Sequence, residues 1–156
     1  MIESILVPKR RIRVIMDKNC KIPLEEKLDV KISFNENNVI IEGEGLELYK
    51  AKEIIKAIAR GFSPVRAFRL LEDNQELRII DIEPEKRAHI IRSRLIGTKG
   101  KTRKSIEEHT KCFMSIYGNT VALIGDYSQI EKARHAIEMI MRGSPHGKVY
   151  NYLETL

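Results

Sequence analysis

The sequence predicts an α+β fold made of two copies of one small domain, each followed by an extra helix. Two observations support this: the 156-residue chain aligns with itself at a shift of 82 positions, and both halves show the same succession of apolar and amphipathic segments. Residues 24–72 align with residues 106–154 without a gap, and 14 of these 49 positions are identical. We expect domains at residues 1–74 and 75–156, with the polar stretch 73–76 as the linker.

Each copy begins with a short apolar strand that ends before a proline. These strands are predicted at residues 5–7, before Pro8, and at residues 79–82, before Pro84. Proline suits the first turn of a helix, so a basic helix is expected next in each copy. After a loop, a second helix ends near LEEKLD at residues 24–29 or IEEHTK at residues 106–111.

Two strands and an amphipathic helix complete each copy. VKISF and VIIEG in the first copy correspond to CFMSIYG and VALIG in the second, and Asn- and Gly-containing turns separate the members of each pair. The helix over residues 129–143 spaces its apolar residues by three and four positions, which predicts one buried face: Ile130, Ala133, Ile137 and Ile140. Both final helices are expected to end at glycine, Gly61 or Gly143, with a proline two or three residues beyond. The order is β-α-α-β-β-α.

A further segment follows each copy and is expected to form a helix. It reads SPVRAFRLLED at residues 63–73 and SPHGKVYNYLE at residues 144–154. Its apolar residues predict packing on its own domain or on the other domain.

The positive charge is concentrated in one window of the chain. The net charge is +6, but residues 86–104 alone carry +8 and contain no acid, which leaves −2 for the rest. Such a window predicts an anionic partner. Its basic residues are Lys86, Arg87, Arg92, Arg94, Lys99, Lys101, Arg103 and Lys104. A second basic run near the start comprises Lys9, Arg10, Arg11 and Arg13.

Several classes of protein are not expected. No apolar run is long enough for a membrane span, and the N-terminus lacks the features of a signal peptide, so a cytoplasmic protein is predicted. Cys20 and Cys112 are expected to be reduced thiols, and no cysteine or histidine has metal-ligand spacing. No cofactor is expected. No catalytic grouping appears, since the pairs 25–26 and 107–108 are glutamates expected on solvated helix ends, so we predict a non-enzyme.

The stretch LIGTKGKT at residues 95–102 has two possible interpretations. A Walker A loop, GxxxxGK[ST], would place its first glycine at Leu95, and it would follow a buried strand rather than a helix. A GxxG turn between two helices fits better. Glycines at 97 and 100 let a sugar-phosphate backbone approach closely, and the next helix offers its N-terminal N–H groups and nearby cations to phosphate.

A GxxG turn within this order of elements resembles a type I KH domain, whose loop clamps about four nucleotides of single-stranded nucleic acid. More specifically, the chain resembles the Partner-of-Nob family of small-subunit ribosome assembly factors, in an archaeal form with two tandem type I KH domains. Arg103 departs from the generic KH pattern, which has an apolar residue there. The motifs that carry the resemblance are GTKGKTRKSIEE, SIYGNTVALIGD, RGSPHGKVYNYLE and GFSPVRAFRLLED.

The resemblance implies binding to single-stranded RNA in the 3′ region of small-subunit ribosomal RNA, on the pre-ribosomal small subunit and alongside a Nob-type endonuclease. The predicted RNA-binding residues are those of the loop and its flanks, Gly97, Thr98, Lys99, Gly100, Lys101, Arg103 and Lys104, and those of a groove beside it, Arg92, Arg94, Ile96, Ile106 and Met114. Ile96, Ile106 and Met114 could instead belong to the core, and Arg92 and Arg94 could lie on a solvated helix face.

The first copy has no glycine at the loop position. From Pro8 to Leu24 it is six residues shorter than the second copy, and the loop position reads Asp17-Lys18-Asn19-Cys20. Asp17 would repel a phosphate. Two alternatives to the ribosomal role therefore stay open: a KH-shaped protein–protein adaptor, and a KH protein that binds other single-stranded RNA.

Overall fold

The computed structural model describes residues 1–156 and confirms an α+β fold with antiparallel sheets. The chain divides into two compact units, Met1–Asp73 and Asn74–Leu156. We call them unit 1 and unit 2.

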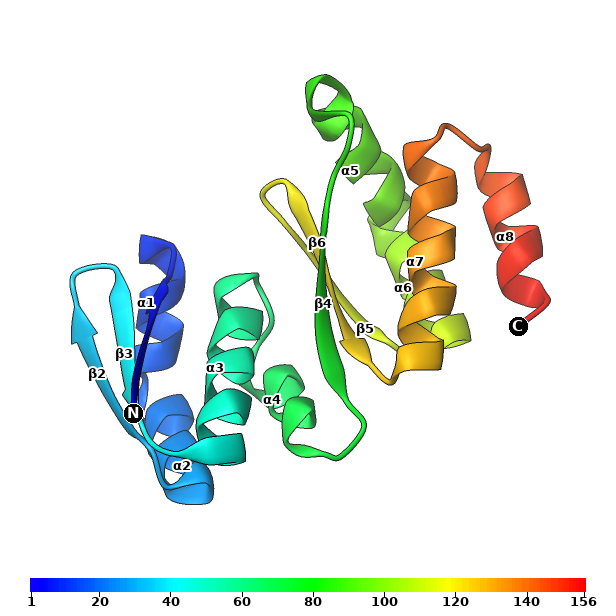
Figure 1. Ribbon diagram of the computed structural model, residues 1–156. Coiled ribbons are helices and arrows are strands. Elements are labelled where there is room, and N and C mark those ends of the chain that lie inside the picture. The colour runs from blue at the N-terminus through cyan, green and yellow to red at the C-terminus, as the bar shows by residue number, and fades with distance from the viewer. The chain divides into compact units, whose positions relative to one another are not determined.

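Unit 1 is a three-stranded sheet with helices on one face (Figure 1). Its strands are antiparallel in the order β1-β3-β2. Its elements, in sequence, are β1 (Ile2–Leu6), α1 (Lys9–Met16), α2 (Lys18–Leu28), β2 (Lys31–Asn35), β3 (Asn38–Glu42), α3 (Gly45–Ala59), α4 (Pro64–Ala67) and the 3-10 turn η1 (Phe68–Leu71).

Unit 2 repeats this order of elements and the same sheet order, β4-β6-β5 (Figure 1). The predicted linker is too long, because Glu76 already pairs with Gly125 in the sheet. The elements are β4 (Glu76–Asp81), η2 (Glu85–Arg87), α5 (Ala88–Ile96), η3 (Thr98–Gly100), α6 (Lys101–Thr110), β5 (Phe113–Tyr117), β6 (Thr120–Gly125), α7 (Tyr127–Met141) and α8 (His146–Glu154).

The extra segment of each unit packs on its own unit. In unit 1, α4 contacts α3, and in unit 2, α8 contacts both α6 and α7. The sequence left open whether each extra segment packs on its own domain or on the other domain. Each segment contacts at least its own domain.

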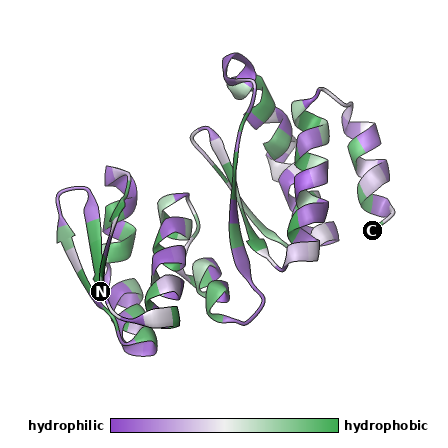
Figure 2. Ribbon diagram, viewed as in Figure 1, coloured by the Kyte–Doolittle hydropathy of each residue, from purple (hydrophilic) through white to green (hydrophobic).

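The core of unit 2 lies between its sheet and its helices. The predicted face of α7 is confirmed, because Ile130, Ala133, Ile137 and Ile140 are each at most 1% exposed. Figure 2 shows hydrophobic and hydrophilic positions alternating around α3 and α7, as expected of helices with one buried face. None of the helices combines the length and the apolar character that crossing a bilayer would require.

One glutamate in each unit ties the second helix to the neighbouring strand. In unit 2, Glu107 of α6 accepts a hydrogen bond from the backbone N–H of Met114 at 2.8 Å and pairs with Arg103 at 2.7 Å. In unit 1, Glu25 accepts from the N–H of Ile32 at 2.8 Å and lies 3.6 Å from Lys21. The glutamate, its basic partner and the strand residue in unit 1 correspond to those in unit 2 at the shift of 82. Both contacts of the glutamate are therefore duplicated.

The sequence analysis expected both glutamate pairs, 25–26 and 107–108, to lie on solvated helix ends. This prediction is wrong at Glu25 and Glu107. Their carboxylates are held by backbone N–H groups, whereas the neighbouring residues Glu26 and Glu108 are exposed. A carboxylate that accepts a strand N–H has a structural role in each unit.

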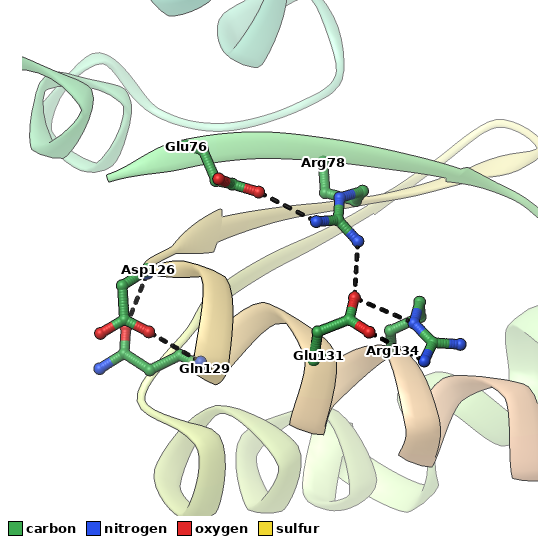
Figure 3. A network of polar contacts seen from close by, with 6 residues as sticks. All are labelled: Glu76, Arg78, Asp126, Gln129, Glu131 and Arg134. Carbon is green, nitrogen blue, oxygen red and sulfur yellow. Dashed lines mark hydrogen bonds and ion pairs between the residues drawn. The ribbon is translucent and has the colours of Figure 1, made fainter. Parts of the chain in front are cut away.

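A polar network joins β4 to α7 in unit 2 (Figure 3). The Arg78 guanidinium bridges Glu76 at 3.0 Å and Glu131 at 2.8 Å, and Glu131 also accepts from Arg134. These contacts lower the pKa of Glu131, the hydrogen bond from Arg134 most of all. In unit 1 the charges are reversed, since Glu3 of β1 lies 3.5 Å from Lys52 of α3.

The duplicated carboxylate contact predicts a clear difference between adjacent glutamates. We expect Glu107→Ala to lower the free energy of unfolding by about 1–3 kcal/mol, because the N–H of Met114 loses a charged acceptor. Glu108→Ala, one residue away and exposed, should change it by less than about 0.5 kcal/mol. Urea unfolding measures both values. Glu25→Ala and Glu26→Ala form the matched pair in unit 1, and equal effects within a pair would contradict the assignment.

The two thiols are expected to be unreactive in the folded protein. Cys20 and Cys112 are each 1% exposed. Burial, and secondarily the charge of Asp17, raise the pKa of Cys20 to about 11, so thiolate is scarce at pH 8. A colorimetric disulfide reagent at pH 8 should label neither cysteine until denaturant is added. Ser93→Cys, at an exposed position of α5, provides the rapidly reacting control. Fast labelling of the native wild-type protein would contradict the burial.

Candidate functional site

The GxxG turn connects α5 to α6 through three residues with positive φ. Gly97 ends α5 with φ of +74°, Lys99 has φ of +55°, and Gly100 begins α6 with φ of +73°. Two hydrogen bonds close the turn, from the N–H of Gly97 to the carbonyl of Ser93 at 2.9 Å and from the N–H of Gly100 to the carbonyl of Gly97 at 3.1 Å. The turn is therefore a defined structure rather than an open loop.

The two glycines are required for different reasons. A Cβ at residue 97 would lie 2.3 Å from Oγ1 of Thr102 and 2.8 Å from its backbone nitrogen, so no side chain fits. A Cβ at residue 100 would approach nothing closer than 3.9 Å, so only the left-handed backbone favours glycine there. Gly97 thus permits the close approach of α6, and Gly100 leaves the turn open to solvent.

The solvent side of the turn presents cations and no acid. Thr98, Lys99, Lys101 and Lys104 are exposed. The first turn of α6 contains no acidic residue, and no side chain caps its N-terminus. No group of three or more His, Cys, Asp or Glu side chains is placed to hold a metal ion. The arrangement is suited to binding an anion, because backbone N–H groups, the positive end of a helix and lysines all meet there.

Three predicted groove residues lie on α5 and α6, the helices that the turn connects. Ile96, at the end of α5, is 40% exposed. Arg92 is partly buried and donates to the carbonyl of Gly118 in the β5–β6 turn at 2.9 Å. Arg103 is partly buried and paired with Glu107. Arg92 and Arg103 thus lie toward the β5 side of the unit, and Ile96 leaves part of an apolar side chain exposed directly before the turn.

Arg94 does not belong to this edge, which corrects the sequence prediction. Its guanidinium donates to the carbonyls of Ile140 at 3.1 Å and of Ser144, beyond the end of α7. In unit 1, Arg11 of α1 donates to the carbonyls of Ile58 and Phe62, both at 2.8 Å. These carbonyls are related to those of Ile140 and Ser144 by the shift of 82. Each arginine therefore fastens the first helix of its unit to the backbone at the end of α3 or α7.

Ile106 and Met114 are also corrected. They are 0% and 3% exposed and lie in the hydrophobic core of unit 2. Ile106 faces inward from α6, and Met114 faces inward from β5. Neither side chain reaches the surface, because the inward positions of a helix and of a strand meet beneath the groove.

The sequence prediction missed the contacts that hold the turn from behind. Thr102 is 2% exposed, and its hydroxyl lies 3.1 Å from the hydroxyl of Tyr150 in α8. His146, at the start of α8, contacts the carbonyl of Arg94 through Nε2 at 3.0 Å. One sequence feature could have drawn attention to Thr102: it is the only β-branched residue in the basic stretch 99–104. The motif RGSPHGKVYNYLE contains both α8 residues.

Unit 1 has a different connection at the corresponding position. Asp17 alone separates α1 from α2, and its carboxylate caps α2 by accepting from the N–H of Asn19 at 2.8 Å. A carboxylate thus occupies the helix N-terminus that is uncapped in unit 2. Lys9, Arg10 and Arg13 remain exposed on α1.

The order β-α-α-β-β-α, the sheet order and the GxxG turn define unit 2 as a type I KH domain. Residues 74–156 match a family model described as a eukaryotic type KH domain (KH domain type I) of PNO1, its second KH domain. This match covers more than half of the chain. The chain belongs to the PNO1 family, which confirms the resemblance to the Partner-of-Nob proteins.

Similar proteins span nearly the whole chain. A KH domain-containing protein of Methanocaldococcus jannaschii is 38% identical, over 98% of this chain and 73% of its own length. An RNA-binding protein pno1 of Ixodes scapularis is 29% identical, over 99% of this chain and 73% of its own. A chain in a crystal structure of an a/eIF2alpha-aDim2p-rRNA complex from Pyrococcus horikoshii is 43% identical with a TM-score of 0.94, covering 99% of this chain and 93% of that one.

The geometry of the turn predicts unequal effects for three glycine substitutions. Gly97→Ala should lower the free energy of unfolding by about 2–3 kcal/mol, because it combines a positive φ with a backbone clash. Gly100→Ala should cost about 1 kcal/mol for its left-handed backbone alone. Gly147→Ala, in α8, meets nothing within 4 Å and should be neutral or slightly stabilising. Urea unfolding of the three variants tests this order, and equal costs at 97 and 100 would contradict it.

Proposed function

We propose that this protein is an RNA-binding assembly factor for the small ribosomal subunit, and that the GxxG face of unit 2 holds single-stranded ribosomal RNA. The observation that carries this proposal is the turn itself: two glycines with positive φ precede an uncapped helix that has only basic charge in its first turn. A phosphate at this place would receive helix N–H groups and lysine ammonium groups together.

The proposed RNA-binding residues divide by chemistry. Gly97, Thr98, Lys99, Gly100, Lys101 and Lys104 contact the RNA backbone, which provides most of the affinity. Arg92, Ile96 and Arg103 lie beside the bases, where stacking and base edges provide selectivity.

We further propose that unit 1 is a degenerate KH domain, so that residues 1–74 and 75–156 form two tandem KH domains. The shared order of elements and the duplicated contacts of Glu25/Glu107 and Arg11/Arg94 support this. Because Asp17 caps α2 where a phosphate would bind, unit 1 holds a protein partner or extends the basic surface through Lys9, Arg10 and Arg13.

The RNA proposed is the 3′ region of small-subunit ribosomal RNA, on the pre-ribosomal small subunit in the cytoplasm, where the protein assists a Nob-type endonuclease without being an enzyme itself. The Pyrococcus horikoshii complex, which contains rRNA and a/eIF2alpha together with a chain 43% identical to this one, supports both an RNA partner and a protein partner. A KH-shaped protein adaptor is the second candidate, favoured by the missing glycine turn of unit 1.

The double substitution Thr98→Asp with Lys99→Asp tests the proposal. It removes one positive charge and adds two negative charges at exposed positions of the turn. Wild-type affinity for a labelled single strand matching the ribosomal 3′ end should fall with salt at a slope of about −0.7 per phosphate neutralised. The variant should lose most of this affinity, because its carboxylates repel the phosphates.

The matched control is Lys18→Asp with Asn19→Asp in unit 1. It makes the same change of charge at two exposed residues that directly follow Asp17. We expect it to bind RNA nearly as wild type does. Equal binding by the turn variant and wild type would move the site away from the turn, and no binding by wild type would favour the adaptor.

A further inference from the structure

Helix α6 presents a second basic face, on the flank that points away from β5. Arg103 and Glu107 lie on the β5 flank, whereas Lys101, Lys104 and Ser105 recur on the other flank at a spacing of three and four. Thr102, Ile106 and Thr110, between the two flanks, are buried. The charge around the turn is therefore divided between two sides of one helix.

This second face is one wall of a groove of about 580 Å³ between α6 and α8. Its lining includes three lysines, two carboxylates and two aromatic rings: Lys99, Lys101, Lys104, Glu108, Glu154, His109 and Tyr150. The ammonium groups outnumber the carboxylates, and they share one concave surface with the rings. Lys99 and Lys101 also belong to the turn, so the groove is continuous with it.

Both aromatic rings of the groove are anchored. The Tyr150 hydroxyl lies 3.1 Å from the buried hydroxyl of Thr102, and Nδ1 of His109 lies 2.8 Å from the carbonyl of Ser105. Each ring therefore has a hydrogen-bonding partner within the unit. An anchored ring loses little conformational entropy when a planar ligand stacks on it.

We infer that the groove between α6 and α8 is a second RNA subsite, which holds nucleotides that continue from the strand clamped by the turn. Lysines along a groove neutralise successive phosphates, and aromatic rings accept bases of any identity. The inference rests on the proposed function, because the strand must first be held at the turn. It predicts an RNA footprint longer than the roughly four nucleotides of one KH domain.

The length of the bound RNA tests the inference. We compare wild-type affinity for a single strand of about four nucleotides with affinity for strands extended by about four nucleotides at the 5′ or the 3′ end. One extension should tighten binding by about tenfold or more, as expected for stacking of one or two bases on aromatic rings. The salt slope should steepen by about 0.7 for each further phosphate neutralised.

Two substitutions of Tyr150 separate stacking from a structural role. Tyr150→Leu should remove most of the gain from the extension. Because Tyr150 also supports the turn through Thr102, affinity for the short strand is compared with that of Tyr150→Phe, which loses the same hydroxyl contact. Tyr150→Phe keeps the ring and should keep the gain. If Tyr150→Leu also weakens the short strand, the decision rests on His109→Ala, because His109 is exposed and outside the core. Lys148→Ala, at an exposed position of α8 outside the groove, is the control and should bind both strands as wild type does.

The outcomes distinguish the two proposals. A wild-type protein that binds the short strand but gains nothing from either extension would overturn the second subsite and leave the proposed function intact. A gain that survives both Tyr150→Leu and His109→Ala would also overturn it, because the extra nucleotides would then lie elsewhere. A wild-type protein that binds neither strand would overturn the proposed function itself.

Discussion

The absence of a side chain at residue 97 is the constraint on which the candidate site depends. Since a Cβ there would lie 2.3 Å from Oγ1 of Thr102, only glycine lets α6 start directly against the end of α5. That approach buries Thr102 and brings its hydroxyl to Tyr150, which links α8 to the turn. The exposed lysines of the turn are thus supported by a chain of contacts that runs from the backbone of Gly97 to the last helix.

The two units separate what the fold requires from what the proposed function requires. The carboxylate of Glu25 or Glu107 holds a strand N–H in each unit, and the guanidinium of Arg11 or Arg94 holds two carbonyls at and just beyond the end of α3 or α7. These contacts persist although the loops differ, because each joins a side chain to backbone groups that the shared topology places at the same position in both units. The glycine turn has no counterpart in unit 1, where Asp17 caps the helix instead. The glycine turn, present in unit 2 only, is therefore the feature that we assign to ligand binding.

The basic residues of the window 86–104 also separate into two groups, those held by partners within unit 2 and those that are exposed. Arg94 is held by carbonyls, and Arg103 is paired with Glu107 at 2.7 Å. Lys99, Lys101 and Lys104 are exposed and lie around the uncapped start of α6. The positive field at the turn therefore comes from fewer side chains than the composition indicates, and two of them, Lys101 and Lys104, lie on one flank of α6.

The sequence by itself determined the α+β class, the duplication, the order of strands and helices, the buried face of α7 and the glycine turn. These features depend on local spacing: apolar periodicity, proline and glycine positions, and a self-alignment without gaps. It could not tell which of the polar and apolar residues near the turn face outward. Ile96 is exposed while Ile106 and Met114 are buried, and Arg92 lies at the β5–β6 turn while Arg94 lies at the end of α7. Only the tertiary structure decided these roles, because they depend on partners 26 to 50 positions away in the chain, whose distances no local pattern contains.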